Sequence, residues 1–347
     1  MDGTDVDRVR VTMLNLQTPA LLVDEAAFAF NLATMADRLP GSRLRPHVKA
    51  HKCSELARRQ REVGHHAFTC ATIREMEVMA ACGLGDDLLL ANEVADATRL
   101  STLVEAGARV TVAVDSVATI EAAVRAGIPE VVIDVNVGLP RCGCDVEDAG
   151  ALADAARKRG LAVRGVMGYE GHAVGITGRA ERQRAVDDSM AVLARAHQIV
   201  GGDLVTAGGT GSFDLNTVAT EIQAGSYALM DTAYAAIGLP FRHALSVLAT
   251  VISVNPAGWV VADCGLKALG MDHGNPTVVG GGAVWFCSDE HVTYAPGDDD
   301  PPPAVGDQIE LLPAHVDPTV AYHEALHVVD AERSTVVETW PVDMRGW

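Results

Sequence analysis

Short apolar segments alternate with segments of helical periodicity from about residue 45 to residue 230. Each apolar run ends in small or polar residues, and an Ala-, Leu-, Arg- and Glu-rich stretch that favours helix follows it. The runs predict eight strands, at 45–49, 67–71, 87–92, 110–115, 131–137, 163–169, 204–209 and 221–226. Helices are predicted between them at 53–63, 73–81, 95–106, 116–125, 146–159 and 179–200, whereas 212–220 is only weakly helical. Because strands that alternate with helices at this spacing are parallel, the pattern predicts a (β/α)₈ barrel.

The pattern changes after Pro240, where the helical signals end. Short strands separated by Gly, Pro and Asp are predicted at 247–254, 258–262, 277–284, 292–294 and 308–312. The chain is therefore expected to be an α/β protein with a barrel over 18–242 and a smaller β-domain over 243–347 together with 1–17. The extended segment 20–24 fits either domain.

A doubly wound open sheet is the alternative to the barrel. That fold is indicated by the fingerprint G-x-G-x-x-G after the first strand, and the fingerprint is missing here. The barrel is therefore the architecture that the sequence favours.

Charge and composition exclude several classes of protein. Of the 347 residues, 46 are acidic and 27 basic, so a formal charge of −19 would repel nucleic acid and an anionic membrane surface. No apolar run reaches the roughly 18 residues of a membrane span, and the acidic N-terminus is unlike a signal peptide. Seven cysteines without metal-finger or thioredoxin spacing indicate reduced thiols. These features predict a soluble cytoplasmic protein.

Lys49 is the first candidate for chemistry, because barrel enzymes place their active sites where strands end. His47 and Lys49 lie on one face of the first predicted strand, and both side chains could point into the barrel. Desolvation would lower the pKa of a lysine there, which would make it a good Schiff-base nucleophile. Alternatively, the side chain simply reaches solvent. The other lysines are Lys52, Lys158 and Lys267, so candidates for an imine are few.

Glycine-rich turns follow the last two predicted barrel strands. The seventh strand leads into Gly208-Gly209-Thr210-Gly211-Ser212, and the eighth ends in Ala224-Gly225-Ser226-Tyr227. Loops at these two places frequently bind phosphate in barrels, and glycine allows the backbone to approach closely. No G-K-[ST] follows, so the turn is not a nucleotide P-loop. A phosphate site is therefore predicted, with a plain turn as the alternative.

Three further side chains are expected at the same mouth. Tyr169 and His172, after the sixth strand, offer stacking and acid–base groups. Arg141, after the fifth strand, could fix a carboxylate or a pyridine nitrogen. Each of them is otherwise an ordinary loop residue.

The β-domain contains a candidate metal pair. On an extended chain His315 and Asp317 project to the same side, which suits two ligands of one divalent ion. The alternative is a solvated loop. His323 and His327 would form a second pair if their segment were helical.

Taken together, these segments resemble one known family. The segments are Thr18–Asp24, Arg45–Lys49, Gly168–His172, Gly208–Ser212 and Pro313–Pro318. Their order and spacing resemble the D-threonine aldolase and D-serine dehydratase group, pyridoxal-phosphate enzymes with the alanine-racemase type of barrel. The resemblance covers residues 16–330.

The resemblance implies a cofactor and a metal. Lys49 would carry the internal aldimine, the turns Gly208–Ser212 and Gly225–Tyr227 would hold the pyridoxal 5′-phosphate, and His315 and Asp317 would bind the metal. Aldolases of the group show His-x-Asp, whereas its dehydratases show His-x-Cys and use zinc. A carboxylate suits harder ions, so Mn²⁺ is the expected metal, with Mg²⁺, Co²⁺ and Zn²⁺ as alternatives.

The implied activity is retro-aldol cleavage of D-threonine and related D-β-hydroxy-α-amino acids to glycine and an aldehyde. His172 is the first candidate for the base that takes the hydroxyl proton. The alternatives are a D-serine or D-threo-3-hydroxyaspartate dehydratase, a racemase and a non-catalytic carrier of pyridoxal phosphate. The metal pair disfavours the racemase, and the β-domain disfavours the carrier. Enzymes of this type often close their site with a partner's β-domain, so a homodimer is expected.

Overall fold

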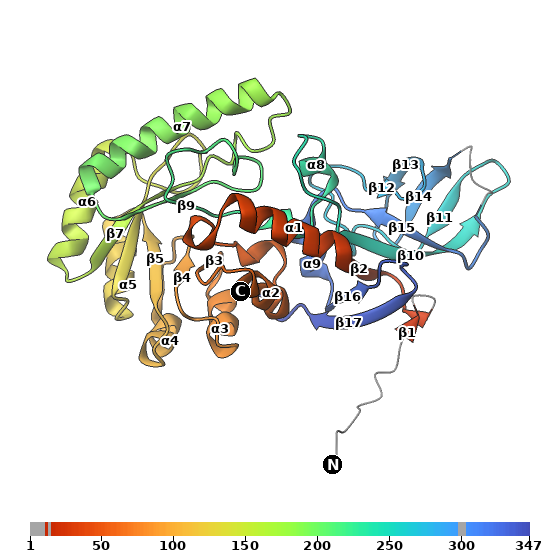
Figure 1. Ribbon diagram of the computed structural model, residues 1–347, viewed down its shortest axis with the longest axis horizontal. Helices are drawn as coiled ribbons and strands as arrows, with labels where there is room; N and C mark the ends of the chain where they lie inside the picture. The colour runs from red at the N-terminus through yellow and green to blue at the C-terminus, as the bar shows by residue number, and fades with distance from the viewer. Residues whose placement is uncertain (1–10, 13–14, 298–302) are drawn as a thin grey trace, which may run out of the picture.

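The structure is a computed structural model, and it describes residues 11–12, 15–297 and 303–347. Two β-sheets organise these residues, a parallel sheet wrapped by helices and a mainly antiparallel sheet beside it (Figure 1). None of the described helices is both long and apolar enough to cross a membrane. Apart from strand β1 (Val11–Thr12), the expectations for the N-terminal segment 1–14 lie outside the described residues.

The parallel sheet contains seven of the eight predicted barrel strands, in sequence order. They are β3 (Phe68–Cys70), β4 (Leu88–Leu90), β5 (Val110–Val114), β6 (Glu130–Asp134), β7 (Ala162–Gly168), β8 (Leu204–Ala207) and β9 (Glu221–Ile222). The helices are α2 (Ser54–Glu62), α3 (Ile73–Ala81), α4 (Ser101–Glu105), α5 (Val117–Arg125), α6 (Val146–Lys158) and α7 (Arg179–Val200). The helices cover the outer side of the sheet, which confirms the predicted alanine-racemase type of barrel.

The first predicted strand, 45–49, is not a strand. Leu44 and His47 form isolated bridges to β9 and β3, and Val48–Ala50 is a 3₁₀ helix. The segment still lies between β9 and β3, since the N–H of Arg45 donates to Ile222 and the carbonyl of Pro46 accepts from Thr69. Pro46 has no N–H to give to β3, so a regular ladder cannot form. The barrel therefore closes through this irregular segment.

Local sequence signals set the helix ends. Thr72 Oγ1 accepts from the N–H of Glu75, whose side chain in turn accepts from the N–H of Thr72, so a capping box begins α3. Gly83 follows the helix with a φ of 73°, a conformation that glycine adopts without strain. The predicted helix over 73–81 matches these ends.

The second sheet contains ten strands. From one edge they are β1, β17 (Thr335–Pro341), β16 (Ala325–Val329), β2 (Ala20–Asp24), β10 (Leu245–Val254), β11 (Val260–Ala262), β14 (Val292–Pro296) and β13 (Gly282–Cys287). Off this path, β15 (Gln308–Leu312) pairs with β10, and β12 (Thr277–Val278) pairs with β15. The short helices α8 (Thr232–Ala235) and α9 (Val316–Tyr322) lie between this sheet and the barrel. Most of the strands predicted after Pro240 are therefore present.

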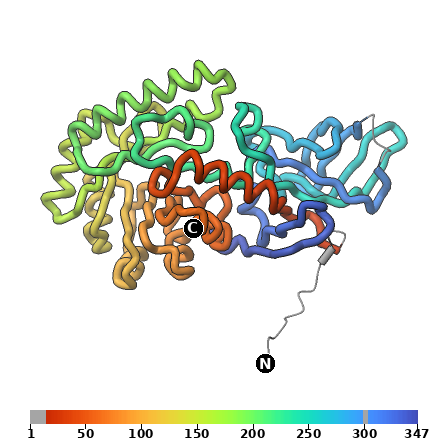
Figure 2. The backbone as a smooth tube through the Cα atoms, viewed as in Figure 1, coloured from red at the N-terminus to blue at the C-terminus, as the bar shows by residue number. Residues whose placement is uncertain are grey.

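The chain crosses between the two domains more than once. Strand β2 pairs with β10 and β16, so residues 20–24 belong to the second sheet, and α1 (Glu25–Arg38) leads from there to the barrel. At the other end the N–H of Met344 donates to the carbonyl of Lys52, which places the C-terminus beside α2 (Figure 2). One hydrophobic cluster continues through both sheets. The two domains therefore share one hydrophobic core, and β2 belongs to the sheet of the second domain.

A buried ion network lies at the amino ends of the barrel strands. Arg45, which is 1% exposed, donates to Glu221 at 2.6 Å and to Asp87 at 3.1 Å, and Arg164 also donates to Asp87 at 2.9 Å. Burial alone would raise the pKa of Asp87, but its hydrogen bonds to the two arginines hold that pKa well below its usual value. The network ties the irregular first segment to the rest of the barrel.

Breaking this network is expected to destabilise the protein strongly. Arg45→Met leaves Glu221 buried without its cation, so the free energy of unfolding should fall by about 3–5 kcal/mol. Urea unfolding at pH 7 would measure it. Arg195→Met is the matched control, because the Arg195–Glu147 pair lies at the surface, away from this network, and should contribute less than about 1 kcal/mol. Equal effects of the two substitutions would contradict the assignment.

Acid should weaken the same network. The folded pKa of Asp87 lies below its unfolded value of about 3.9, so its contribution is present above that pH and is lost as the pH falls toward the folded pKa.

Candidate active site

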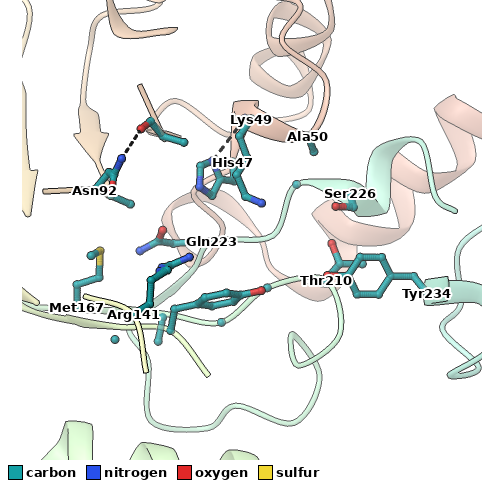
Figure 3. A pocket seen from close by; sticks show the side chains of 18 residues that line it. His47, Lys49, Ala50, Asn92, Arg141, Met167, Thr210, Gln223, Ser226 and Tyr234 are labelled. Atoms are coloured by element: carbon teal, nitrogen blue, oxygen red, sulfur yellow. Dashed lines mark hydrogen bonds between the residues drawn. The ribbon is translucent and has the colours of Figure 1, made fainter. Parts of the chain in front are cut away.

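A cavity of about 900 Å³, counting its open mouth, lies at the carboxyl ends of the barrel strands. His47 and Lys49 line one side, while Thr210, Ser226 and Tyr234 lie at one end (Figure 3). Met167, Asn92 and Gln223 lie toward the other end, where Gln223 donates to Thr206 at 2.8 Å. The cavity is therefore where the fold predicts a barrel enzyme's active site.

Lys49 and Asp317 meet beside the cavity, although they come from different domains. Lys49 Nζ is 2.7 Å from Asp317 Oδ2, and Ser226 Oγ donates to Asp317 Oδ1 at 3.2 Å. The Asp317 carboxylate raises the pKa of Lys49, with burial acting in the opposite direction. Burial alone would raise the pKa of Asp317, but Lys49 holds it below its usual range. The depressed lysine pKa predicted from the sequence is therefore wrong here, because that prediction placed no carboxylate beside the lysine.

His47 is a buried, neutral imidazole next to this pair. Burial lowers its pKa well below the usual value, and repulsion from Lys49 acts in the same direction. Its Nδ1 accepts from the N–H of Lys49 at 3.5 Å at the start of the 3₁₀ helix. Both side chains line the cavity, as predicted, although Lys49 lies in a 3₁₀ helix and not in a strand.

Glu170 organises the glycine-rich turn, and the sequence pattern gave it no role. This fully buried carboxylate accepts from the N–H of Gly208 at 3.2 Å and from Ser212 Oγ at 2.6 Å. Ser212 Oγ in turn accepts from the N–H of Gly209 at 3.2 Å. Gly208 has a φ of 83°, which glycine supplies without strain. Glu170 and Ser212 therefore hold the turn in shape from behind.

The two glycine-rich turns present free N–H groups to the cavity. The N–H groups of Thr210 and Gly225, two residues that line the cavity, donate to no protein acceptor among the described residues. A Cβ at Gly225 would lie 2.3 Å from the carbonyl of His47, so only glycine fits at this approach. A group of free N–H donors in such turns is typical of an anion site.

The structure brings only some of the predicted cofactor residues to the cavity. Lys49, Arg141, Tyr169, Thr210, Gly225 and Ser226 line it. Gly211 lies against Val174, where a Cβ would meet the carbonyl at 2.1 Å, and Ser212 is fully buried. The Tyr227 hydroxyl accepts from Gln60 at 3.1 Å, away from the cavity, while its N–H donates to Thr210. These residues support the turns without lining the cavity.

Arg141 offers a free guanidinium at the mouth. Its charge lies 5.6 Å from the centre of the Tyr169 ring, and it makes no side-chain hydrogen bond to the described residues. Burial raises the pKa of Tyr169. Arg141 is therefore available for an anionic group of a ligand.

His172 is not among the residues that line the cavity. It is exposed, and its ring lies over Gly138, where a Cβ would be 2.8 Å from His172 Cε1. The assignment of His172 as the base stays a prediction.

His315 and Asp317 do not lie on an extended chain. His315 is the N-cap of α9, and Asp317 is in the first helical turn, where an acidic side chain is favourable. Asp231 anchors this turn by accepting from the N–H of Val316 at 3.0 Å. The extended geometry predicted for the pair is therefore wrong, while its role in metal binding stays a prediction.

The second histidine pair is not helical either. His323 follows the last residue of α9 and hydrogen-bonds the carbonyl of Ala268, and His327 lies on β16.

Asp272 and His273 approach His315 from the loop after β11. In the described part of the chain these three form a group whose ligand atoms lie within 4.8 Å of one another. No periodicity or spacing pointed to this loop, since only the tertiary fold brings it to the start of α9. Sequence reasoning therefore missed both residues.

Two family models match the chain, with a boundary close to Pro240. Residues 23–232 match the N-terminal domain of alanine racemase, and residues 244–329 match a putative serine dehydratase domain. The fold and the site thus define the class of protein. It is an enzyme class with an alanine-racemase-like barrel and an added dehydratase-type domain.

Comparison with individual proteins narrows this class. The D-threonine aldolase of Arthrobacter sp. is 35% identical, over 96% of this chain and 94% of its own. The crystal structure of D-threonine aldolase from Filomicrobium marinum has a TM-score of 0.92 at 35% identity and covers 98% of both chains. The D-threo-3-hydroxyaspartate dehydratase of Delftia sp. is 29% identical, over 97% of this chain and 99% of its own. The chain belongs to the D-threonine aldolase and D-serine dehydratase family, as the sequence motifs indicated.

The residues of the cavity fit the pyridoxal phosphate that this family implies. Lys49 Nζ is a primary amine at the cavity, and the free N–H groups of Thr210 and Gly225 suit a phosphate. His315 and Asp317 supply the nitrogen and oxygen ligands that a divalent metal takes. His315 Nε2 has no partner among the described residues, and so it is free for a metal.

Proposed function

We propose that the protein is a pyridoxal-phosphate- and divalent-metal-dependent lyase that cleaves D-threonine and related D-β-hydroxy-α-amino acids to glycine and an aldehyde. The observation that carries the proposal is the meeting of Lys49 and Asp317 at 2.7 Å. A cofactor-binding lysine of the barrel and a metal-binding carboxylate of the β-domain thereby serve one cavity.

The roles of the residues follow from their positions. Lys49 would hold the cofactor covalently, and the N–H groups of Thr210 and Gly225 would hold its phosphate. Arg141 would bind an anionic group, and His315 and Asp317 would hold the metal. When bound, the cofactor withdraws electrons from the substrate Cα, and the metal lowers the pKa of a hydroxyl group. His172 would take the hydroxyl proton.

A direct assay tests this activity. Purified protein with pyridoxal phosphate and Mn²⁺ is incubated with D-threonine, and glycine plus acetaldehyde are quantified against 2-oxobutanoate. We expect glycine and acetaldehyde in equal amounts, and no turnover of L-threonine. Formation of 2-oxobutanoate as the main product would show that the protein is a dehydratase and not an aldolase.

Dehydration is the second candidate, and the dehydratase-type domain over residues 244–329 favours it. In that case the metal would assist the departure of a hydroxide. Asp317 argues for the aldolase, because a carboxylate suits harder ions than the thiolate of the dehydratase motif. D-Serine and D-threo-3-hydroxyaspartate, assayed for ammonia release, separate the two reactions.

A carboxylate placed in the glycine-rich turn should weaken cofactor binding. A Cβ at Gly209 would lie 3.4 Å from the Tyr169 ring, so a side chain fits there. Gly209→Asp should raise the dissociation constant of pyridoxal phosphate by about 100-fold or more, because an unpaired charge would face the phosphate. Fluorescence titration of the cofactor-free protein measures this. Gly209→Asn is the neutral control of the same size. If both substitutions weaken cofactor binding equally, the phosphate does not bind at this turn.

A further inference from the structure

His315 has a hydrogen-bond partner outside its own motif. Its Nδ1 lies 2.9 Å from Asp272 Oδ1 and 2.8 Å from Asp272 Oδ2. The His273 ring stacks on the His315 ring at 4.0 Å with an angle of 10° between the planes. The imidazole is therefore held at one edge and on one face by consecutive residues of a single loop.

Backbone contacts keep this loop against the start of α9. Gly270 and His315 form an antiparallel bridge. The N–H of Gly270 donates to Thr319 Oγ1 at 2.8 Å, and Thr319 Oγ1 donates to the carbonyl of His315 at 2.7 Å. A Cβ at Gly270 would lie 2.3 Å from Pro318, so the approach needs glycine. Asp272 is thus placed by the fold, although its side chain is 56% exposed.

The hydrogen bond fixes the tautomer of His315. An ionised carboxylate only accepts, so Nδ1 must carry the proton that it donates to Asp272. The lone pair of the neutral ring is then on Nε2, which has no partner among the described residues. Metal-binding histidines usually donate their other ring N–H to a carboxylate, which orients the ring and makes it a better ligand.

The geometry points to Asp272 as a positioning residue that holds His315 as an Nε2 ligand of the divalent metal. This inference rests on the proposed function for the role of His315. The competing arrangement is an ion held directly by Asp272, His273 and His315, whose ligand atoms lie within 4.8 Å. Both Asp272 oxygens lie within hydrogen-bond distance of Nδ1, which favours an Asp272 that orients His315 over an Asp272 that binds the ion directly. His273 then serves through its stacked ring and not through a nitrogen.

Metal affinity tests the inference independently of turnover. Cofactor-loaded protein is chelated and dialysed, and Mn²⁺ binding is measured from the electron paramagnetic resonance of free Mn²⁺, with the cofactor absorbance of each sample recorded. Asp272→Ala should weaken Mn²⁺ binding about 10- to 100-fold at unchanged cofactor absorbance. Asp272→Asn should recover most of the loss, because its amide oxygen still accepts from Nδ1. His273→Phe keeps the stacked ring and should stay within about threefold of the parent protein.

Two results would overturn the inference. Unchanged affinity in Asp272→Ala removes the positioning role, and a loss in His273→Phe as large as in Asp272→Ala makes the two residues direct ligands. The D-threonine assay on the same samples separates this inference from the proposed function. If Asp272→Ala loses Mn²⁺ while the parent protein binds Mn²⁺ without cleaving D-threonine, the positioning role stands and the proposed reaction fails.

Discussion

Lys49→Ala is expected to abolish D-threonine cleavage and the covalent attachment of the cofactor together. The loss of kcat/KM should be on the order of 10⁴-fold or more, the scale on which enzymes lose activity when a covalent nucleophile is removed. The physical reason is that Lys49 has the primary amine at the cavity, next to the free N–H groups of Thr210 and Gly225. Lys52 is already committed to an ion pair with the buried Glu75.

Borohydride reduction followed by peptide mapping measures the attachment site. We expect the label on the peptide that contains Lys49, and no stable label in Lys49→Ala. Lys267→Ala is the matched control, because Lys267 pairs with Glu290 at the surface and should keep full activity. A label on Lys52 or Lys267 would refute the assignment.

The barrel was predictable because its periodicity is local. Each strand and helix between β3 and α7 is coded by its own apolar residues, and capping boxes begin α3 and α5. The irregular form of the first segment was signalled locally only by Pro46, because its pairing with Ile222 and Thr69 joins residues that lie far apart in the sequence.

The site was only partly predictable, for the same reason. Thr210 and Ser226 come after the ends of β8 and β9, and Lys49 lies at the same end of the irregular first segment, so their positions indicated the cavity. Glu170 and Asp272 act through tertiary hydrogen bonds, which leave no pattern in one sequence. The pKa of Lys49 needed knowledge of Asp317, 268 residues away.

Removal of the metal is expected to abolish cleavage while the cofactor stays in place. The proposed metal ligands His315 and Asp317 lie in the second domain, whereas Lys49 and the glycine-rich turns belong to the barrel. Chelation should therefore reduce turnover by on the order of 10³-fold or more, since the metal contributes several kcal/mol of charge stabilisation. With pyridoxal phosphate kept in excess, the cofactor absorbance should not change. His315→Ala should behave like the chelated protein.

The identity of the metal depends on Asp317. Mn²⁺ should restore the chelated protein at least as well as Zn²⁺, and Asp317→Cys should shift this preference toward Zn²⁺, because thiolate is the softer ligand. Chelated protein that still cleaves D-threonine at the full rate would exclude a catalytic metal.

Cofactor and metal should also support each other's binding through Asp317. In this structure the Lys49 ammonium lies 2.7 Å from Asp317 Oδ2, so it would compete with a metal for that oxygen. A Lys49 that held the cofactor covalently would no longer pair with Asp317, and the carboxylate would then be available to the metal. Cofactor-free protein should therefore bind Mn²⁺ about 5- to 150-fold more weakly than cofactor-loaded protein, and by linkage Mn²⁺ should tighten cofactor binding by the same factor. Titrations in both orders measure this, and cofactor-free Lys49→Ala should bind Mn²⁺ more tightly than the cofactor-free parent. Equal Mn²⁺ affinities in all three proteins would show that Lys49 does not compete for Asp317.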